Sequence, residues 1–175
     1  MAGKRQLLVL RHAKSSWDDA SLADFDRPLA PRGAKTAPLM GAEIARRGWL
    51  PEFALVSPSL RTRETWRLAT ASWPQPLPPV TYPQELYEAS AAEILAEVQS
   101  VPHSVGTLLV LGHNPGLESF VRMLAGPDSA ETALRLVREK FPTGALARLE
   151  LSGGWDSLGP GSATLTHMLR PKDVG

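Results

Sequence analysis

The sequence predicts an α/β fold in which residues 1–175 form a single domain. Short, continuous apolar runs alternate along the chain with longer amphipathic stretches, which is the pattern of strands connected by crossover helices. Two of these runs are apolar at every position, as expected for strands that are buried on both faces of a parallel sheet. The chain is long enough to bury a sizeable core, and it has no cysteine, which excludes a disulfide framework.

Six strands and five helices are expected, with boundaries set by the apolar runs and by Pro and Gly residues. The predicted strands are Gln6–Leu10, Phe53–Val56, Val80–Tyr82, Thr107–Leu111, Ala145–Leu151 and Ala163–Leu169. The predicted helices are Gly33–Arg47, Ser59–Ala71, Ala91–Val101, Leu117–Leu124 and Ser129–Arg138. Pro38 conflicts with the first helix, which is expected to kink there or to begin later, because proline lacks a backbone N–H.

Two helix ends have a local physical basis. Gly48 follows Arg46 and Arg47, and a helix is expected to end there because cations favour the negative end of the helix dipole and glycine accepts a left-handed conformation. Ser57 followed by Pro58 predicts a helix start, with the serine hydroxyl as the cap and the proline in the first turn.

Charge and hydropathy exclude several classes of protein. There are 19 Lys and Arg against 18 Asp and Glu, so the net charge is +1, without the basic excess typical of nucleic-acid-binding domains. No run approaches the roughly 20 apolar residues of a membrane span, and the first run is too short for a signal peptide. We therefore expect a soluble, cytoplasmic protein with no nucleic-acid or membrane partner.

A near-repeat is the most informative feature of the sequence. Leu7–His12 reads LLVLRH, and Leu108–His113 reads LLVLGH, so a histidine lies two residues beyond each fully apolar run. Ligands of open parallel sheets bind beyond the carboxyl ends of the strands. If these two strands are neighbours, about 4.8 Å apart, the two imidazoles converge on one small group.

Two arginines are expected at the same edge of the sheet. Arg11 precedes His12, and Arg61 lies in the first helical turn after a third strand. Guanidinium groups and helix N-termini both bind oxyanions, so these side chains and His113 describe a phosphate pocket. The alternative is that each is an ordinary loop histidine or a solvated arginine. The repeated offset favours the pocket, and the absence of HxH and HExxH spacings disfavours a metal site.

Ordered motifs along the chain resemble the histidine phosphatase superfamily, also called phosphoglycerate-mutase-like. They are Arg11-His12-Ala13, Ser57–Thr65 and Gly112-His113-Asn114-Pro115. Four more segments resemble its SixA branch, the phosphohistidine phosphatases: Arg11–Trp17, Asp26–Gly33, Leu86–Ser90 and Lys140–Gly144. The resemblance covers nearly the whole chain. It implies a three-layer α/β/α sandwich whose six-stranded, mostly parallel sheet has neighbouring first and fourth strands and an antiparallel fifth strand.

The resemblance also implies roles for the residues of the pocket. His12 would be the nucleophile that takes the phosphoryl group, while Arg11, Arg61 and His113 hold its oxygens. Asn114 is a further phosphate-binding candidate, and it stands where the acid-phosphatase branch has a proton-donating aspartate. Neither a metal nor another cofactor is implied.

The proton donor and the substrate contacts are left open. Mutase-like members use a glutamate downstream of the second arginine, which indicates Glu88, with Glu85 as the alternative; both could instead be solvated carboxylates. Lys14, Ser15 and Asp18 follow the first strand and could contact the substrate or lie in solvent.

We therefore expect a metal-independent phosphatase with a covalent phosphohistidine intermediate at His12. Imidazole is a better leaving group than an alkoxide, so a pocket without an assured acid favours a phosphorylated protein histidine, such as that of a histidine-containing phosphotransfer domain. Two alternatives stay open. One is a phosphomonoesterase for a small phosphorylated metabolite, nucleotide or phosphosugar, and the other is a non-catalytic phosphate-binding module.

Overall fold

The computed structural model describes residues 4–175 and contains a six-stranded sheet in the order β3-β2-β4-β1-β5-β6. The strands are β1 (Arg5–Arg11), β2 (Phe53–Val56), β3 (Val80–Thr81), β4 (Thr107–Gly112), β5 (Leu146–Leu151) and β6 (Thr164–Leu169). Neighbouring strands from β3 to β1 run parallel, whereas β5 runs antiparallel to both β1 and β6. The expected mostly parallel sheet with an antiparallel fifth strand is confirmed.

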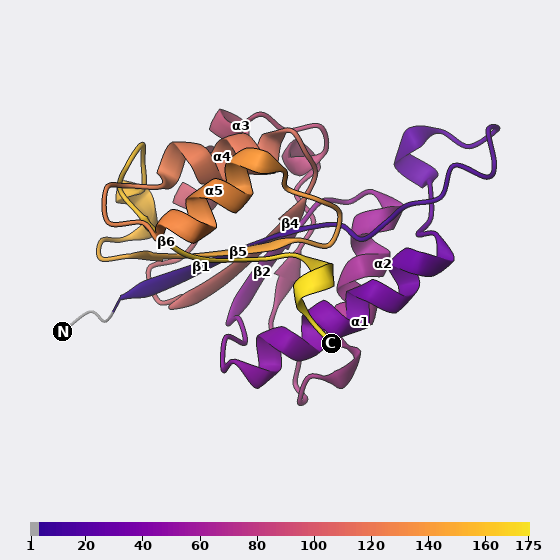
Figure 1. Cartoon of the computed structure of the whole chain (residues 1–175), viewed down its shortest axis with the longest axis horizontal. Coiled ribbons are helices and arrows are strands. Elements are labelled where there is room, and N and C mark those ends of the chain that lie inside the picture. Colours follow the sequence, from indigo (N-terminus) through magenta and orange to yellow (C-terminus); the bar gives the residue numbers. More distant parts are fainter. Residues whose placement is uncertain (1–3) are drawn as a thin grey trace.

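Helices cover both faces of this sheet, as Figure 1 shows. They are α1 (Pro31–Arg46), α2 (Leu60–Ala69), α3 (Ala91–Gln99), α4 (Gly116–Leu124) and α5 (Glu131–Glu139). α1 and α2 lie on one face, and α3, α4 and α5 lie on the other, so the layers are those of an α/β/α sandwich. Within residues 4–175, no helix combines the length and the apolar character needed to cross a membrane.

The central strands are apolar at every position because each face packs against a helical layer. Leu7 and Val9 of β1 are buried in the core beneath α3, α4 and α5, whereas Leu8 and Leu10 are buried against α1 and α2. Two separate hydrophobic cores therefore hold β1 in place from opposite sides, and the strand end is a rigid platform for the residues that follow it.

The two segments of the near-repeat, Leu7–His12 and Leu108–His113, are paired in register in the sheet. Leu7 lies opposite Leu108, and Arg11 lies opposite Gly112, in the parallel β1–β4 pair. Because parallel strands end at the same edge of a sheet, this register brings His12 and His113 out side by side. Equivalent positions of the near-repeat are therefore paired with each other in the two strands.

The first helix differs from the expectation at its start. α1 begins at Pro31, where proline suits the first helical position, and it continues through Pro38. The expectation that the helix could begin later because of Pro38 is wrong. Its end is as predicted, since Gly48 has a φ of 75° and its N–H donates to the carbonyl of Ala45.

The predicted helix cap at Ser57 is also wrong. α2 begins at Leu60, and Ser59 occupies the capping position without a side-chain bond to the backbone of the first turn. The Ser59 hydroxyl instead contacts the hydroxyl of Thr62, which donates to the carbonyl of Ser57. Ser57 thus belongs to the connection between β2 and α2, and its own hydroxyl is available to the edge of the sheet.

Candidate active site

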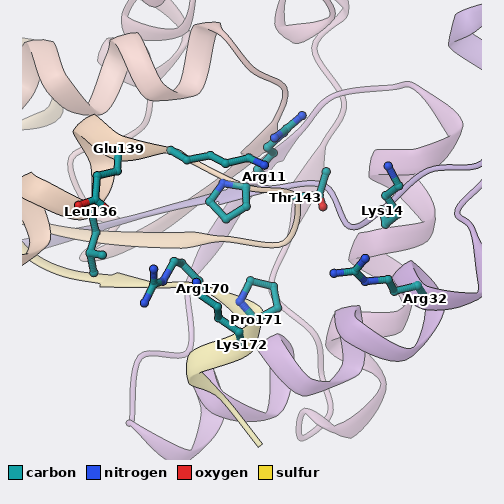
Figure 2. A pocket seen from close by; sticks show the side chains of 11 residues that line it. Arg11, Lys14, Arg32, Leu136, Glu139, Thr143, Arg170, Pro171 and Lys172 are labelled. Carbon is teal, nitrogen blue, oxygen red and sulfur yellow. The ribbon is translucent and has the colours of Figure 1, made fainter.

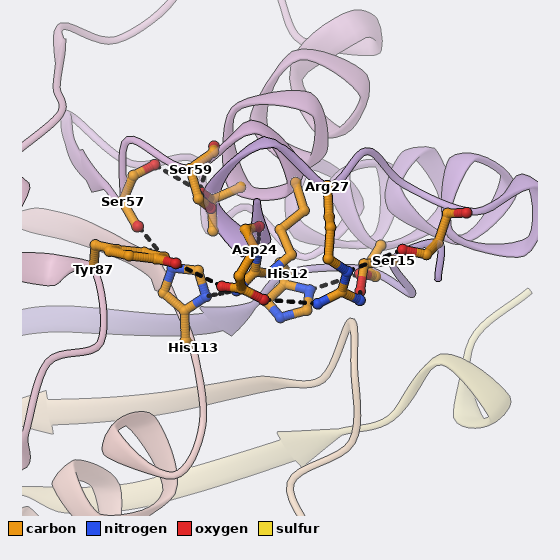
Figure 3. Close-up of polar contacts among 12 residues, drawn as sticks. His12, Ser15, Asp24, Arg27, Ser57, Ser59, Tyr87 and His113 are labelled. Carbon is orange, nitrogen blue, oxygen red and sulfur yellow. Dashed lines mark hydrogen bonds and ion pairs between the residues drawn. The ribbon is translucent and has the colours of Figure 1, made fainter. Parts of the chain in front are cut away.

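The rings of His12 and His113 face each other beyond the carboxyl ends of β1 and β4 (Figure 3). Their centroids lie 5.4 Å apart, and their planes are inclined by 55°. Both residues are buried, with 6% and 9% of their surface exposed, respectively. The prediction that the two imidazoles converge at one edge is confirmed.

Among residues 4–175, one ring nitrogen of His12 has a hydrogen-bond partner and the other has none. Its Nδ1 lies 2.7 Å from the carbonyl oxygen of Ala13, and because a carbonyl can only accept, Nδ1 carries the proton. Nε2 is therefore the unprotonated nitrogen. Burial is the main reason that the pKa of His12 falls to about 3, and the nearby Arg61 charge acts in the same direction. The ring is neutral at pH 7 and has a lone pair for attack.

Both ring nitrogens of His113 are engaged. Nε2 lies 2.7 Å from Oγ of Ser57, and Nδ1 lies 3.4 Å from Nη2 of Arg61. A guanidinium can only donate, so Nδ1 is the acceptor and Nε2–H donates to Ser57. Burial, followed by the charge of Arg61, lowers the pKa of His113 to about 4. This ring is neutral and is held in a fixed orientation.

Arg61 is the second residue of α2. Its side chain is buried and extends to the two histidines. Its Nη1 donates to the backbone carbonyl of Asp24 at 2.8 Å, and its Nη2 donates to the carboxylate of Asp24 at 3.0 Å. Arg61 lies where the sequence predicts it, beside His113. It also has an acidic partner that the sequence analysis did not identify.

Asp24 lies in a short 3-10 turn, Asp24–Asp26, within the long loop between β1 and α1. Its carboxylate accepts hydrogen bonds from the hydroxyl of Tyr87 at 2.6 Å and from Arg27 at 2.9 Å. The Tyr87 bond is the largest of the effects that lower the pKa of Asp24 to about 2. Asp24 is therefore ionised at neutral pH, and the loop is tied to Arg61 by a charge-assisted contact.

Tyr87 is a second residue of the site that the sequence analysis missed. Its ring packs edge-on against that of His113, with centroids 5.6 Å apart. Burial, followed by the hydrogen bond to Asp24, raises the pKa of Tyr87 to about 12. Tyr87 lies in the Leu86–Ser90 segment that carries part of the family resemblance, but no local sequence pattern indicates its contact with His113.

Arg11, the last residue of β1, is anchored next to His12. Its Nη1 donates to the carbonyl of Phe141 at 2.9 Å, and its Nε is buried without a hydrogen-bond partner among residues 4–175. The turn that follows Phe141 supports the same strand end, because the N–H of Gly144 donates to the carbonyls of both Arg11 and His12. Gly144 has a φ of 78°, a conformation that favours glycine.

Both polar atoms of the Asn114 side-chain amide form hydrogen bonds with backbone groups, and neither bonds to the ring of His12. Its Nδ2 donates to the carbonyl of Phe141 at 2.9 Å, the same oxygen that accepts from Arg11. Its Oδ1 accepts from the backbone N–H of Glu118 in the first turn of α4 at 3.1 Å. These contacts connect Arg11, the Phe141 turn and α4, and they place Asn114 in a supporting position.

The two candidate proton donors lie in different places. Glu88 is exposed, has a φ of 57°, and lines a hollow of about 440 Å³ together with His113 and Asn114. Glu85 lies in the 3-10 turn Gln84–Leu86, and its charge contributes to the raised pKa of Glu97 on α3, after the burial of Glu97 itself. Glu88 is thus the candidate that the fold brings to the edge of the site.

The loop residues proposed to contact substrate are placed in three ways. Ser15 is buried, and its hydroxyl accepts from Arg27 at 2.6 Å, so it holds the loop together (Figure 3). Asp18 is exposed, and its backbone N–H donates to the hydroxyl of Ser16. Lys14 is exposed at the rim of a groove next to Arg11.

The assembled side chains can bind a phosphate group beside a nucleophile. Arginine side chains match the oxygens of a phosphate dianion, and a neutral imidazole nitrogen can attack phosphorus. In the part of the chain that the structure describes, no group of three or more His, Cys, Asp or Glu side chains is arranged to hold a metal ion.

Comparisons with known proteins are consistent with this geometry. The sequence profile of the histidine phosphatase superfamily (branch 1) matches residues 7–101. An uncharacterized protein of Mycobacterium tuberculosis is 37% identical over 164 residues, which are 93% of this chain and 100% of that protein. Among solved structures, the "putative phosphohistidine phosphatase SixA" from Nakamurella multipartitia has a TM-score of 0.85 and 31% identity, over 97% of this chain and 98% of that chain. The protein described in the same words from Agrobacterium tumefaciens has a TM-score of 0.81 and 26% identity, over 97% of this chain and 100% of that chain.

Proposed function

The chain belongs to the histidine phosphatase superfamily (branch 1) and is a phosphatase, and we propose that it dephosphorylates a protein phosphohistidine through a covalent intermediate at His12. The observation that carries this proposal is the free Nε2 of a neutral, buried imidazole next to a second imidazole 5.4 Å away and the guanidinium of Arg61. The structural neighbours described as phosphohistidine phosphatases support the choice of substrate.

The reaction has two steps. In the first, Nε2 of His12 attacks the substrate phosphorus, an N–P bond forms, and the N–P bond of the substrate breaks, so that a protein imidazole leaves. In the second, water attacks the phosphorylated His12, which releases inorganic phosphate and regenerates the neutral ring. The Nδ1–H bond to the Ala13 carbonyl keeps the same nitrogen directed at phosphorus in both steps.

In this proposal, Arg11 and Arg61 hold the oxygens of the transferring group, and His113 binds one of these oxygens when it replaces the Ser57 hydroxyl as the acceptor of the Nε2–H. The transition state of phosphoryl transfer is loose and spreads its charge over three oxygens, so preorganised cations and N–H donors supply most of the stabilisation. Arg61 is preorganised by its contacts with Asp24 and His113. In this proposal, Asn114 acts indirectly, by holding the Phe141 carbonyl that anchors Arg11.

Glu88 is the proposed proton donor for leaving groups that need one. It lines the same hollow as His113, whereas Asp24, which lies closer to Arg61, is ionised because its pKa is lowered to about 2. An alkoxide needs a proton as it leaves, but imidazole leaves readily, so the position of Glu88 at the edge of the site suits a phosphohistidine substrate.

A substrate panel tests this function. The protein is assayed with a histidine-containing phosphotransfer domain phosphorylated on histidine and with a set of small alkyl phosphates at matched concentrations. We expect a higher kcat/KM for the phosphoprotein, and we expect Glu88→Gln to slow the alkyl phosphates but not the phosphoprotein. A preference for one alkyl phosphate would instead support a small-molecule phosphomonoesterase, and no turnover of any substrate would support a phosphate-binding module.

A further inference from the structure

A groove of about 590 Å³ lies beside the phosphate pocket and reaches the C-terminal turn (Figure 2). Arg11 lines the groove, so the groove and the phosphate pocket share a wall. In Figure 2, Lys14 and Arg32 lie on one side of this groove, and Glu139 and Arg170 lie on the other. Its cationic lining residues are Arg11, Lys14, Arg32, Lys140, Arg170 and Lys172.

The positive charge of the molecule is concentrated in this groove. Among the described residues that line it, Glu139 is the single carboxylate against six cations. The whole chain has a net charge of only +1, so the remainder of the chain is net negative. The cations come from four separate segments: the end of β1 with the loop after it, the start of α1, the segment before β5 and the C-terminal turn. Whole-chain composition therefore gives no sign of this basic surface.

Most of these cations have no anionic partner among the residues that the structure describes. Lys14, Arg32, Lys140 and Lys172 are exposed, and none of them forms an ion pair with a carboxylate in residues 4–175. Arg170 differs, since it pairs with Asp173. The helix α1 also begins here without a side-chain cap, so the positive end of its dipole adds to the field. Clustered like charges repel one another, and an anionic partner relieves that repulsion.

We propose that this groove binds an acidic surface patch of the phosphoprotein whose phosphohistidine enters the His12 pocket. The proposal rests on the proposed function and specifies the chemistry of the partner. An acidic patch seated in the groove lies against Arg11, which places a neighbouring phosphohistidine next to His12.

The form of the groove favours a protein surface over a second small anion. A subsite for one small anion is expected to resemble the phosphate pocket, where Arg61 is nearly buried and is fixed by several hydrogen bonds. Four of the six groove cations are instead long, exposed side chains, each on a separate segment: Lys14, Arg32, Lys140 and Lys172. Such a surface suits an extended patch of carboxylates, which steers the encounter and sets the register of two proteins.

A pair of charge reversals tests the proposal. Lys140→Glu/Lys172→Glu changes two groove cations, whereas Lys4→Glu/Arg67→Glu makes the same change of net charge at two exposed residues that do not line the groove. Each double variant is assayed with a phosphorylated histidine-containing phosphotransfer domain that has an acidic surface and with p-nitrophenyl phosphate.

The groove variant is expected to lose about tenfold or more in kcat/KM toward the phosphoprotein at low ionic strength. The loss is expected to shrink at about 0.5 M salt, because salt screens exposed charges. Turnover of p-nitrophenyl phosphate should change by no more than about threefold, and the control variant should behave like the wild type. Equal losses in both variants, or on both substrates, would overturn the proposal. The same variants are also assayed with a small bisphosphate, fructose 1,6-bisphosphate. A loss of kcat/KM confined to that substrate would also overturn the proposal.

A binding measurement separates this proposal from the proposed function. If the wild-type protein does not dephosphorylate the phosphoprotein, the proposed function fails, and the groove is tested by fluorescence anisotropy with a labelled peptide of Asp and Glu residues. Binding that is at least about tenfold weaker in the groove variant than in the control variant supports an acidic polypeptide partner. Equal affinity in the two variants contradicts it.

Discussion

At the end of β1, the ring of His12 keeps one nitrogen free, whereas at the end of β4 both nitrogens of His113 are engaged. The two strand ends share nearly the same sequence and lie in the same register. Their partners differ: His12 contacts a backbone carbonyl of its own segment, and His113 contacts side chains delivered by the β2–α2 region. A shared motif sets where the two rings lie, and the surrounding hydrogen bonds distinguish the proposed nucleophile, His12, from the proposed phosphate ligand, His113.

The largest expected effect comes from exchanging the two histidines for alanine. His12→Ala should abolish turnover, with a loss of at least about 10⁴-fold, because it removes the nucleophile. His113→Ala removes one proposed ligand of the phosphate oxygens and should cost about 10² to 10³-fold. Steady-state kinetics with p-nitrophenyl phosphate measure both, and circular dichroism checks that each variant is folded. Equal losses in the two variants would contradict the division of roles between the strand ends.

The next largest effect concerns Arg61, which approaches the His113 side of the site. Arg61→Ala should cost about 2 to 4 kcal/mol of transition-state stabilisation, measured as the ratio of kcat/KM values. Arg67→Ala, on an exposed position of the same helix, is the matched control and should stay close to the wild type. A small effect of Arg61→Ala would mean that Asp24 keeps the guanidinium away from the phosphate.

Ser57 sharpens the comparison because it contacts His113 and not His12. Ser57→Ala removes the acceptor of the Nε2–H bond, and the freed ring should be less well oriented, with a loss of about tenfold in kcat. The labelling of His12 by substrate should still occur at the same nitrogen. If Ser57→Ala leaves kcat unchanged, the hydroxyl does not orient the ring.

The last prediction concerns stability as a function of pH and not activity. Histidine has an ordinary pKa near 6.5, whereas the folded-state pKa is about 3 for His12 and about 4 for His113. As the pH falls below 6.5, the unfolded chain takes up protons that the folded rings do not, so the free energy of unfolding decreases down to about pH 3. The fall in Tm over this window should be smaller for His12→Asn than for the wild type. An unchanged pH dependence would indicate that His12 is not buried in a neutral form.

The sequence predicts the residues at the strand ends well, because parallel pairing places the equivalent positions of a repeated segment next to each other. His12 and His113 follow from that register, and Arg61 follows from its place in the helix after β2. Asp24 could not be predicted in the same way, because it lies in a loop whose path is set by the tertiary contacts of Arg27 and Tyr87.

Two other features depend on side-chain directions that no local pattern encodes. Ser57 precedes a proline and suits a helix cap by residue type, but its hydroxyl turns toward His113 instead of the first turn of α2. The basic groove is a sum over four distant segments, so it exists only after the C-terminal turn and the start of α1 are brought together.

The central claim is that the phosphoryl group passes through Nε2 of His12, and rapid-quench labelling before the steady state tests it most directly. The protein is mixed with excess phosphorylated phosphotransfer domain, quenched in alkali within milliseconds, digested and analysed by mass spectrometry. The account predicts a transient, acid-labile phosphoryl group on the peptide that contains His12, with none on the peptide that contains His113. A phosphoryl group on His113, or turnover with neither ring labelled, would contradict it.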